Sequence, residues 1–202
     1  MRNKIQQGPD GDHLFPSINK LLTENIWVRV FICCIFVQTK NNIMGYTHYW
    51  KLKTVPENYK EQFPKVVTEV QMLIERMPTN SETAGGHFNE DKVILRGGDG
   101  TGKPDISKER ICFNGDGKKG LDHETFHIEF NQEPFEFDFC KTARKPYDQA
   151  VCLCLLSLGN HINGFEFSSD GDKEDWQPAI DFYLSHNGNY ISKNLEKLLA
   201  NL

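Results

Sequence analysis

The feature that most constrains the fold is one long apolar segment, PYDQAVCLCLLSLGNHI, at residues 146–162. A buried strand takes only about four to eight residues, so this segment is too long for a strand. Pro146 suits the first turn of a helix, where its missing N–H leaves no hydrogen bond unmade. The segment therefore predicts a central buried helix against which the other elements must pack.

Shorter segments predict strands, because apolar and polar residues alternate in them or apolar residues run up to a glycine. In FEFDFC we expect Phe135, Phe137 and Phe139 to point inward. In ETFHIEF we expect Phe126, Ile128 and Phe130 to share one face of the strand. The predicted strands lie at about 46–52, 91–98, 109–115, 124–130, 135–140 and 164–171.

Helical spacing of apolar residues predicts further helices at about 54–78, 174–188 and 191–202. In the first of these, Pro64 is expected in the first turn and Pro78 at the end. Strands in succession with helices before and after them indicate an α+β fold. We expect an antiparallel sheet packed against a long buried helix at 147–161, with flanking helices.

Residues 1–43 differ from the rest of the chain and predict a non-native or disordered extension to a single α+β domain at 44–202. They carry a net charge of +2, which leaves −7 for the remainder of a chain whose total is −5. The apolar run IWVRVFICCIFV is shorter than the roughly 20 residues that a membrane-spanning helix needs. Met44 begins the sequence MGYTHYW, so we expect translation to start there; an edge strand at 27–37 or a membrane-associating tail are the alternatives.

Charge and cysteine usage narrow the classes of function. A net charge of −5 argues against a general nucleic-acid coat, which needs a basic surface. The six cysteines form no C-x-x-C pair, and Cys152 and Cys154 fit small buried apolar residues. Without a recognisable signal peptide, these thiols indicate a reduced, cytoplasmic setting with no membrane association.

The sequence LDHETFHIEF contains His-Glu-x-x-His, the motif of zinc peptidases. In a helix, His123 and His127 would share one face and meet one metal ion. The local alternation favours a strand, in which they would stand about 13 Å apart. Residues 131–134 would end any helix within a turn. We therefore predict no metal site and no cofactor.

The sequence GGDGTGKP, residues 97–104, resembles a phosphate-binding P-loop. Pro104 stands where Ser or Thr would hold magnesium, and a strand follows where a helix should. A glycine-rich loop between strands is the favoured interpretation. Gly100 and Lys103 could still close over a ligand, because glycine lets backbone N–H groups approach closely.

Three cations precede the long helix in FCKTARKPYD: Lys141, Arg144 and Lys145. Cations at a helix N-terminus are unfavourable by about 0.3–1 kcal/mol each, because the helix dipole makes that end positive. Their presence there predicts an anion that both the dipole and the side chains bind. The alternative is that they pair with nearby carboxylates or point into water.

Other polar and aromatic residues are weaker candidates. Alternation places Tyr46, His48 and Trp50 on one face, where they could stack on a base, although core packing is the commoner role. Asn114 could shape a pocket rim or a turn. The acidic sequence SSDGDKED lacks the calcium-loop pattern, so it predicts a turn and a helix cap.

The motifs MGYTHYW, ICFNG, HETF and FCKTARKPYD resemble a family of small bacteriophage and bacterial proteins that begin with Met-Gly-Tyr-Thr-His-Tyr-Trp. The resemblance covers residues 44 to about 190 and agrees with a start at Met44. It implies no activity, cofactor or catalytic residue.

The leading functional hypothesis is a binding module for a small anionic ligand, such as a nucleotide, at the basic helix N-terminus. By analogy, a phage accessory or anti-defence factor could sequester a host signalling nucleotide. One alternative is a phosphoester hydrolase or transferase that uses His123, Glu124 or Asp148 as acid or base. Another is a protein-interaction factor without a small ligand. The sequence makes no prediction of oligomeric state.

Overall fold

The computed structural model describes residues 45–77, 93–130 and 133–202, which belong to one compact unit, Gly45–Leu202. The predicted extension at 1–43 and the proposed helix end at Pro78 lie outside the described residues. The elements are β1 (Thr47–Leu52), α2 (Tyr59–Arg76), β2 (Asp105–Ile106), β3 (Arg110–Phe113), the short 3-10 helix η2 (Gly117–Lys119), β4 (Phe126–Glu129), β5 (Phe135–Lys141), α3 (Asp148–His161), β6 (Phe165–Ser169), α4 (Lys173–His186) and α5 (Lys193–Leu199). The α+β prediction is confirmed.

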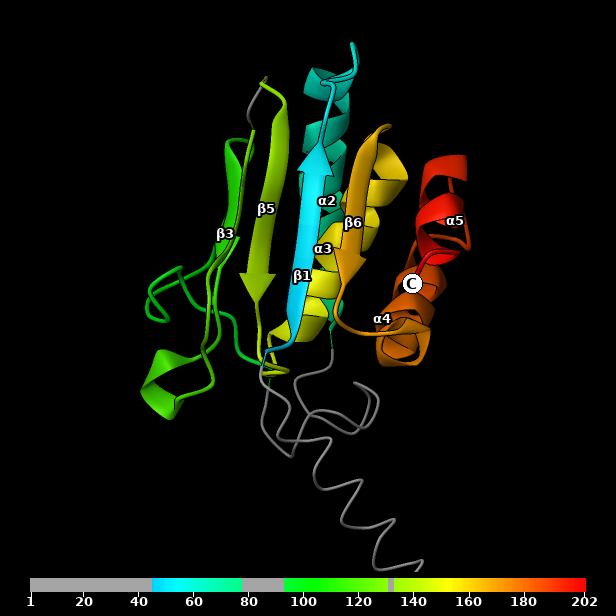
Figure 1. Cartoon of the computed structure of the whole chain (residues 1–202). Coiled ribbons are helices and arrows are strands. Elements are labelled where there is room, and N and C mark those ends of the chain that lie inside the picture. Colours follow the sequence, from blue (N-terminus) through cyan, green and yellow to red (C-terminus); the bar gives the residue numbers. More distant parts are fainter. Residues whose placement is uncertain (1–44, 78–92, 131–132) are drawn as a thin grey trace, which may run out of the picture. The chain divides into compact units, whose positions relative to one another are not determined.

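Two antiparallel sheets carry the strands. In the first, β1 lies between β5 and β6 (Figure 1). In the second, β3 lies between β2 and β4. The alternation in β1 determines how the first sheet packs. His48, Trp50 and Leu52 are buried, whereas Tyr49 and Lys51 between them are partly exposed. One face of this sheet is therefore core and the other is an outer face.

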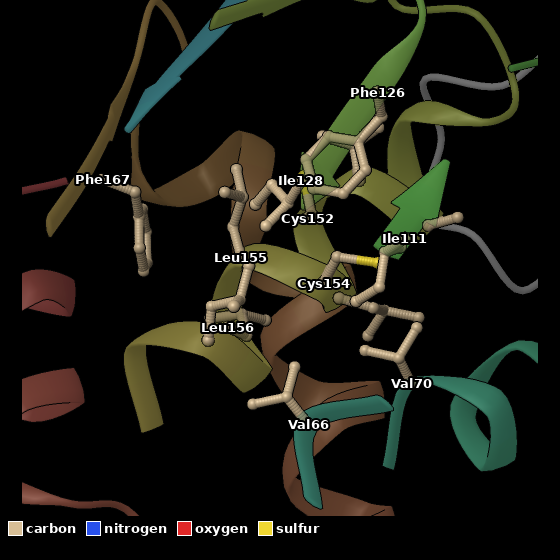
Figure 2. Packing of buried hydrophobic residues seen from close by; sticks show 14 of the residues in the cluster. Val66, Val70, Ile111, Phe126, Ile128, Cys152, Cys154, Leu155, Leu156 and Phe167 are labelled. Carbon is tan, nitrogen blue, oxygen red and sulfur yellow. The ribbon is translucent and has the colours of Figure 1, made fainter. Parts of the chain in front are cut away.

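Helix α3 is buried from Asp148 through Asn160, which explains why its sequence is apolar with almost no polar side. It packs against α2, α4, α5 and β6. Figure 2 shows Cys152, Cys154, Leu155 and Leu156 of α3 among side chains from α2, β3, β4 and β6. Each leucine, isoleucine or valine side chain in this cluster contributes about 1.5–3 kcal/mol when it is fully buried.

The prediction that Phe137 and Phe139 point inward is wrong. Phe137 is 64% exposed and Phe139 is 46% exposed. The register explains this, because Phe139 pairs with outward-facing Tyr49 and Cys140 pairs with buried His48. A bulge between Trp50 and Leu52 then shifts the register by one residue. Phe135 therefore shares the inward face with Leu52 and packs against the core.

Pro64 lies inside α2 and not in its first turn, because the helix begins five residues earlier, at Tyr59. Proline removes one backbone donor from a helix interior. Val66, Val70 and Leu73 beyond it are fully buried, as the helical spacing predicts. Burial of this apolar face keeps the helix continuous through the proline.

Candidate functional site

The connection between β5 and α3 contains a strained turn. Residues Thr142–Lys145 form a tight turn closed by a 3.0 Å hydrogen bond from the Lys145 N–H to the Thr142 carbonyl. Its two central residues, Ala143 and Arg144, have φ of 51° and 56°. Such a turn normally takes Asn-Gly, because other residues cost about 1–2 kcal/mol each in this conformation. Surrounding contacts must therefore hold it in place.

Arg144 supplies those contacts. Its guanidinium donates two hydrogen bonds to Asp175 of α4, at 2.7 and 3.0 Å, and lies 3.9 Å above the centre of the Tyr46 ring. Asp175 in turn belongs to the capping box of α4 with Asp172, so the predicted acidic helix cap is confirmed. Arg144 thus joins the turn to β1 and α4. The two N–H groups with which its guanidinium could bind an anion already donate to a carboxylate of the chain itself.

The other two predicted anion-binding cations do not converge on Arg144's carboxylate partner. The Lys145 ammonium donates to the Gly120 carbonyl at 2.8 Å. The Lys141 side chain runs beside Gly45, where an added Cβ would lie 3.1 Å from Lys141 Cε. Each cation contacts a different segment.

The N-terminus of α3 is met by Asp148. This carboxylate is buried at the first helical residue and accepts hydrogen bonds from the Thr142 hydroxyl and from His48 Nε2, the latter at 2.7 Å. A carboxylate is favourable at this end of a helix dipole. Asp148 therefore supplies a negative charge from the chain itself at the positive end of α3, where the sequence predicts a bound anion.

Cys152 lies one turn further along α3 and completes a buried group that we name the His48 cluster: His48, Asp148 and Cys152. The Cys152 sulfur lies 3.8 Å from His48 Nε2 and 3.9 Å from Asp148 Oδ2. Burial, and next the Asp148 charge, raise the pKa of this thiol well above its usual value. His48 Nδ1 has no hydrogen-bond partner among the described residues.

The predicted stacking residues are buried. Tyr46, His48 and Trp50 are 5%, 0% and 2% exposed, so the structure corrects their proposed contact with a ligand and places them in the core. Tyr46 and Trp176 both meet the His48 ring edge to face, with centroids 5.0 and 5.2 Å away. Core packing, the commoner role of such rings, applies here.

The glycine-rich loop bonds to itself. The Gly97 N–H donates to the Thr101 carbonyl, and the Gly100 N–H donates to Gly97. Strands β2 and β3 follow it and not a helix, and β3 is the strand predicted at 109–115. Lys103 is exposed at its far end. The backbone donors of Gly97 and Gly100 are therefore engaged within the loop, which is not arranged as a phosphate cradle.

Asn114 has a structural role, since all its side-chain bonds go to backbone. Its amide donates to the Gly98 and His123 carbonyls and its oxygen accepts from the Gly115 and His123 N–H groups. The residue is buried, and it ties the glycine-rich loop to the segment before β4.

The candidate acid–base residues lie in different environments. His123 is exposed, whereas Glu124 is half-buried and accepts a 2.7 Å hydrogen bond from the Lys141 N–H. Asp148 belongs to the His48 cluster. His127 lies in β4, so the His-Glu-x-x-His motif runs from a loop into a strand, as predicted. It cannot form the helical metal site of a peptidase.

The outer face of the first sheet carries three adjoining aromatic rings, which we name the outer aromatic face: Tyr49, Phe137 and Phe139. Tyr49 and Phe137 have centroids 5.9 Å apart, and Phe137 and Phe139 are 5.7 Å apart. The strands that carry them, β5 and β1, are the left and centre strands of the first sheet in Figure 1. Exposed apolar groups gathered in this way mark binding surfaces.

A hollow of about 480 Å³ adjoins these rings, and we name it the outer hollow. Its wall includes Tyr49, Phe137, Lys51, Glu166 and Lys197. Lys51 pairs with Glu166 at 2.8 Å and lowers the pKa of that carboxyl, and the charges of Lys53 and Lys197 lower it further. Three lysines thus interact with the Glu166 carboxylate, and the Asp170 carboxylate nearby accepts a 3.1 Å hydrogen bond from the Tyr49 hydroxyl.

Sequence reasoning missed the outer aromatic face. The available signal was the alternation in MGYTHYW, which sets Tyr49 opposite to Tyr46, His48 and Trp50. The sequence could not show which side was core.

Comparisons of the chain with family models, curated proteins and solved structures found no match. No helix within the described ranges has the length and apolar character needed to cross a bilayer.

Proposed function

We propose that the chain binds a small anionic ligand with an aromatic ring, of the nucleotide class, in the outer hollow. The single observation that carries this proposal is the meeting of exposed aromatic rings with lysines at a hollow of ligand size. Ligand sites typically occupy about 300–1,000 Å³, and the outer hollow holds about 480 Å³.

The two kinds of side chain would hold the two parts of a nucleotide. A base stacks on an aromatic side chain with about 1–3 kcal/mol per base. Phe137, which is 64% exposed, and Tyr49 offer such rings. Lys51 and Lys197 would face the phosphate, and the Asn201 amide in the same wall can bond a base edge.

Binding is favoured over catalysis at this place. Among the described residues of the wall, Glu166 is the one acidic group, and Lys51 holds it as a charged carboxylate. A general acid or base needs a pKa near the working pH, and this carboxyl is shifted the other way. Sequestration of a nucleotide therefore suits the hollow better than its hydrolysis.

The proposal keeps the ligand class that the sequence suggests and moves the site. Arg144 is engaged by Asp175, and Asp148 occupies the helix N-terminus, so an anion there would have to displace the chain's own carboxylates. At the outer hollow, one glutamate faces three lysines.

A nucleotide panel tests the proposal by calorimetry and by thermal shift, since a ligand that binds the folded state raises Tm. Phe137→Ala should weaken the tightest nucleotide by about 5- to 150-fold, the equivalent of one stacked base. Tyr190→Ala is the matched control, because Tyr190 is also 64% exposed and lies outside the hollow. Lys197→Gln should weaken binding, whereas Lys103→Gln should not.

Two results would refute the proposal. One is a panel in which no nucleotide binds. The other is binding that survives Phe137→Ala but is lost in Arg144→Ala, which would place the ligand at the strained turn.

A further inference from the structure

We propose that the His48 cluster is a binding site for a divalent ion of the zinc class. The described residues bring together one nitrogen, one carboxylate oxygen and one sulfur, all within 4.8 Å of one another and all buried. This site is independent of the outer hollow.

The direction of the donor atoms favours metal binding over nucleophilic catalysis. In a Cys-His-Asp nucleophile system, the thiol and the carboxylate contact opposite nitrogens of the imidazole, so that the ring passes a proton between them. Here Asp148 and Cys152 both lie at Nε2, and Nδ1 has no partner among the described residues. The ring cannot relay a proton between them, but the three donor atoms lie within 4.8 Å of one another.

The separations also suit a tetrahedral ion. Bonds of about 2.0–2.1 Å to nitrogen or oxygen and about 2.3 Å to sulfur place such ligands roughly 3.4–3.6 Å apart. The sulfur lies 3.8 Å from the nitrogen and 3.9 Å from the nearer carboxylate oxygen. Asp148 Oδ1 lies closer to the nitrogen, at 2.7 Å, because a hydrogen bond joins them; an ion bound by the nitrogen and Oδ2 would replace that hydrogen bond.

The charges balance when the ion binds. The Cys152 thiol releases its proton to solvent as the sulfur–metal bond forms, and the proton on His48 Nε2 moves to Nδ1. This move breaks the hydrogen bond between His48 Nε2 and Asp148, which the bonds to the ion replace, and Nδ1 has no partner among the described residues that the move would disturb. The thiolate and the Asp148 carboxylate then neutralise the two positive charges of the ion, so that the buried group carries no net charge.

A supporting contact already orients one ligand. The Thr142 hydroxyl, itself fully buried, donates to Asp148 Oδ1 and leaves Oδ2 on the side of Cys152. Hydrogen bonds of this kind fix ligating carboxylates in metal sites. Mixed nitrogen, oxygen and sulfur donors select zinc-class ions over magnesium or calcium, which prefer oxygen alone.

Cobalt(II) titration of the full chain tests the site, because cobalt replaces zinc and a cobalt–thiolate bond gives a near-ultraviolet charge-transfer band. The background variant carries Cys33→Ser and Cys34→Ser, since those thiols lie outside the described residues. We expect stoichiometric cobalt, the thiolate band and a raised Tm. Cys152→Ser should abolish the band, and Cys154→Ser, on the same buried helix, should keep it.

If the Cys152→Ser variant fails to fold, a second measurement on the background protein tests the site. X-ray absorption of the cobalt-loaded background protein should show one sulfur at about 2.3 Å with nitrogen or oxygen neighbours at about 2.0–2.1 Å. Substoichiometric cobalt, a thiolate band that survives Cys152→Ser, or a cobalt shell without sulfur would each overturn the proposal.

Discussion

Replacing Ala143 by glycine should stabilise the protein, although it removes a methyl group. Ala143 has φ of 51°, a left-handed conformation that costs a residue with a Cβ about 1–2 kcal/mol. Glycine avoids this cost but loses about 0.5–1 kcal/mol more backbone entropy on folding. Loss of one half-buried methyl costs about 0.4 kcal/mol more, half the value of a buried CH₂. The midpoints of these ranges leave a gain of about 0.3–0.4 kcal/mol.

Arg144→Gly makes the same backbone change one residue later and should have the opposite effect. It relieves a φ of 56° but removes the two hydrogen bonds to Asp175 and the contact with the Tyr46 ring. A half-exposed ion pair contributes about 0.2–1 kcal/mol and a cation–π contact about 0.5–1 kcal/mol. We expect this variant to be less stable than Ala143→Gly by about 1–2 kcal/mol.

Urea unfolding followed by tryptophan fluorescence measures both variants, with an unchanged slope against urea as the check on two-state behaviour. The thermal midpoint should rise by about 1 °C in Ala143→Gly. If Ala143→Gly destabilises the protein as much as Arg144→Gly does, the turn is not strained and the reasoning fails.

Three further changes test other parts of the fold. Glu69→Gln should cost about 2–3 kcal/mol in urea unfolding, because one carboxylate oxygen accepts from Ser157, His161 and Tyr183 and so joins α2 to α3 and α4; a loss below the error of the measurement would contradict this. Burial alone would raise the pKa of Glu69, but the hydrogen bonds from those three side chains outweigh burial and lower the pKa below its usual value of 4.5. The stability that ionised Glu69 contributes is therefore fully present above pH 4.5 and is lost as the pH falls through the lower pKa of the folded state. The acid limb of a stability–pH profile should therefore flatten in Glu69→Gln, and an unchanged limb would contradict the assignment. Gly171→Ala should lower Tm, since its Cβ would overlap the Tyr46 hydroxyl, and an unchanged Tm would show that Tyr46 can move.

The elements of the fold could be predicted from sequence because their patterns are local. The apolar run of α3 and the alternation in β4 each occupy a few consecutive residues, and burial follows from the same pattern. Phe137 and Phe139 could not be placed in this way. Their side of the sheet depends on the pairing of β5 with β1 and on a bulge, which the composition of FEFDFC does not encode.

The surroundings of the basic segment could be predicted only in part. Sequence proximity places Lys141, Arg144 and Lys145 near the start of α3, but their partners are distant in the chain. Asp175 lies 31 residues beyond Arg144. Whether these cations contact a ligand or groups of the protein therefore depends on tertiary contacts, which the local sequence does not show.

The His48 cluster was equally hidden. His48 and Asp148 are 100 residues apart and belong to different motifs. Cys152 stands in an apolar run, where a thiol reads as one more core residue. Only the packing of β1 against α3 brings the three donors together.

The outer hollow is tested most directly by NMR of protein labelled with ¹³C in its phenylalanine and tyrosine rings, titrated with the tightest nucleotide of the panel. A stacked base should shift the ring signals of Phe137 and Tyr49 and leave those of buried Phe63 in place. If the Phe137 and Tyr49 signals stay still while the ring signal of Tyr46 moves, the ligand binds at the turn and the proposed site is wrong, because the Tyr46 ring lies 3.9 Å from the Arg144 guanidinium.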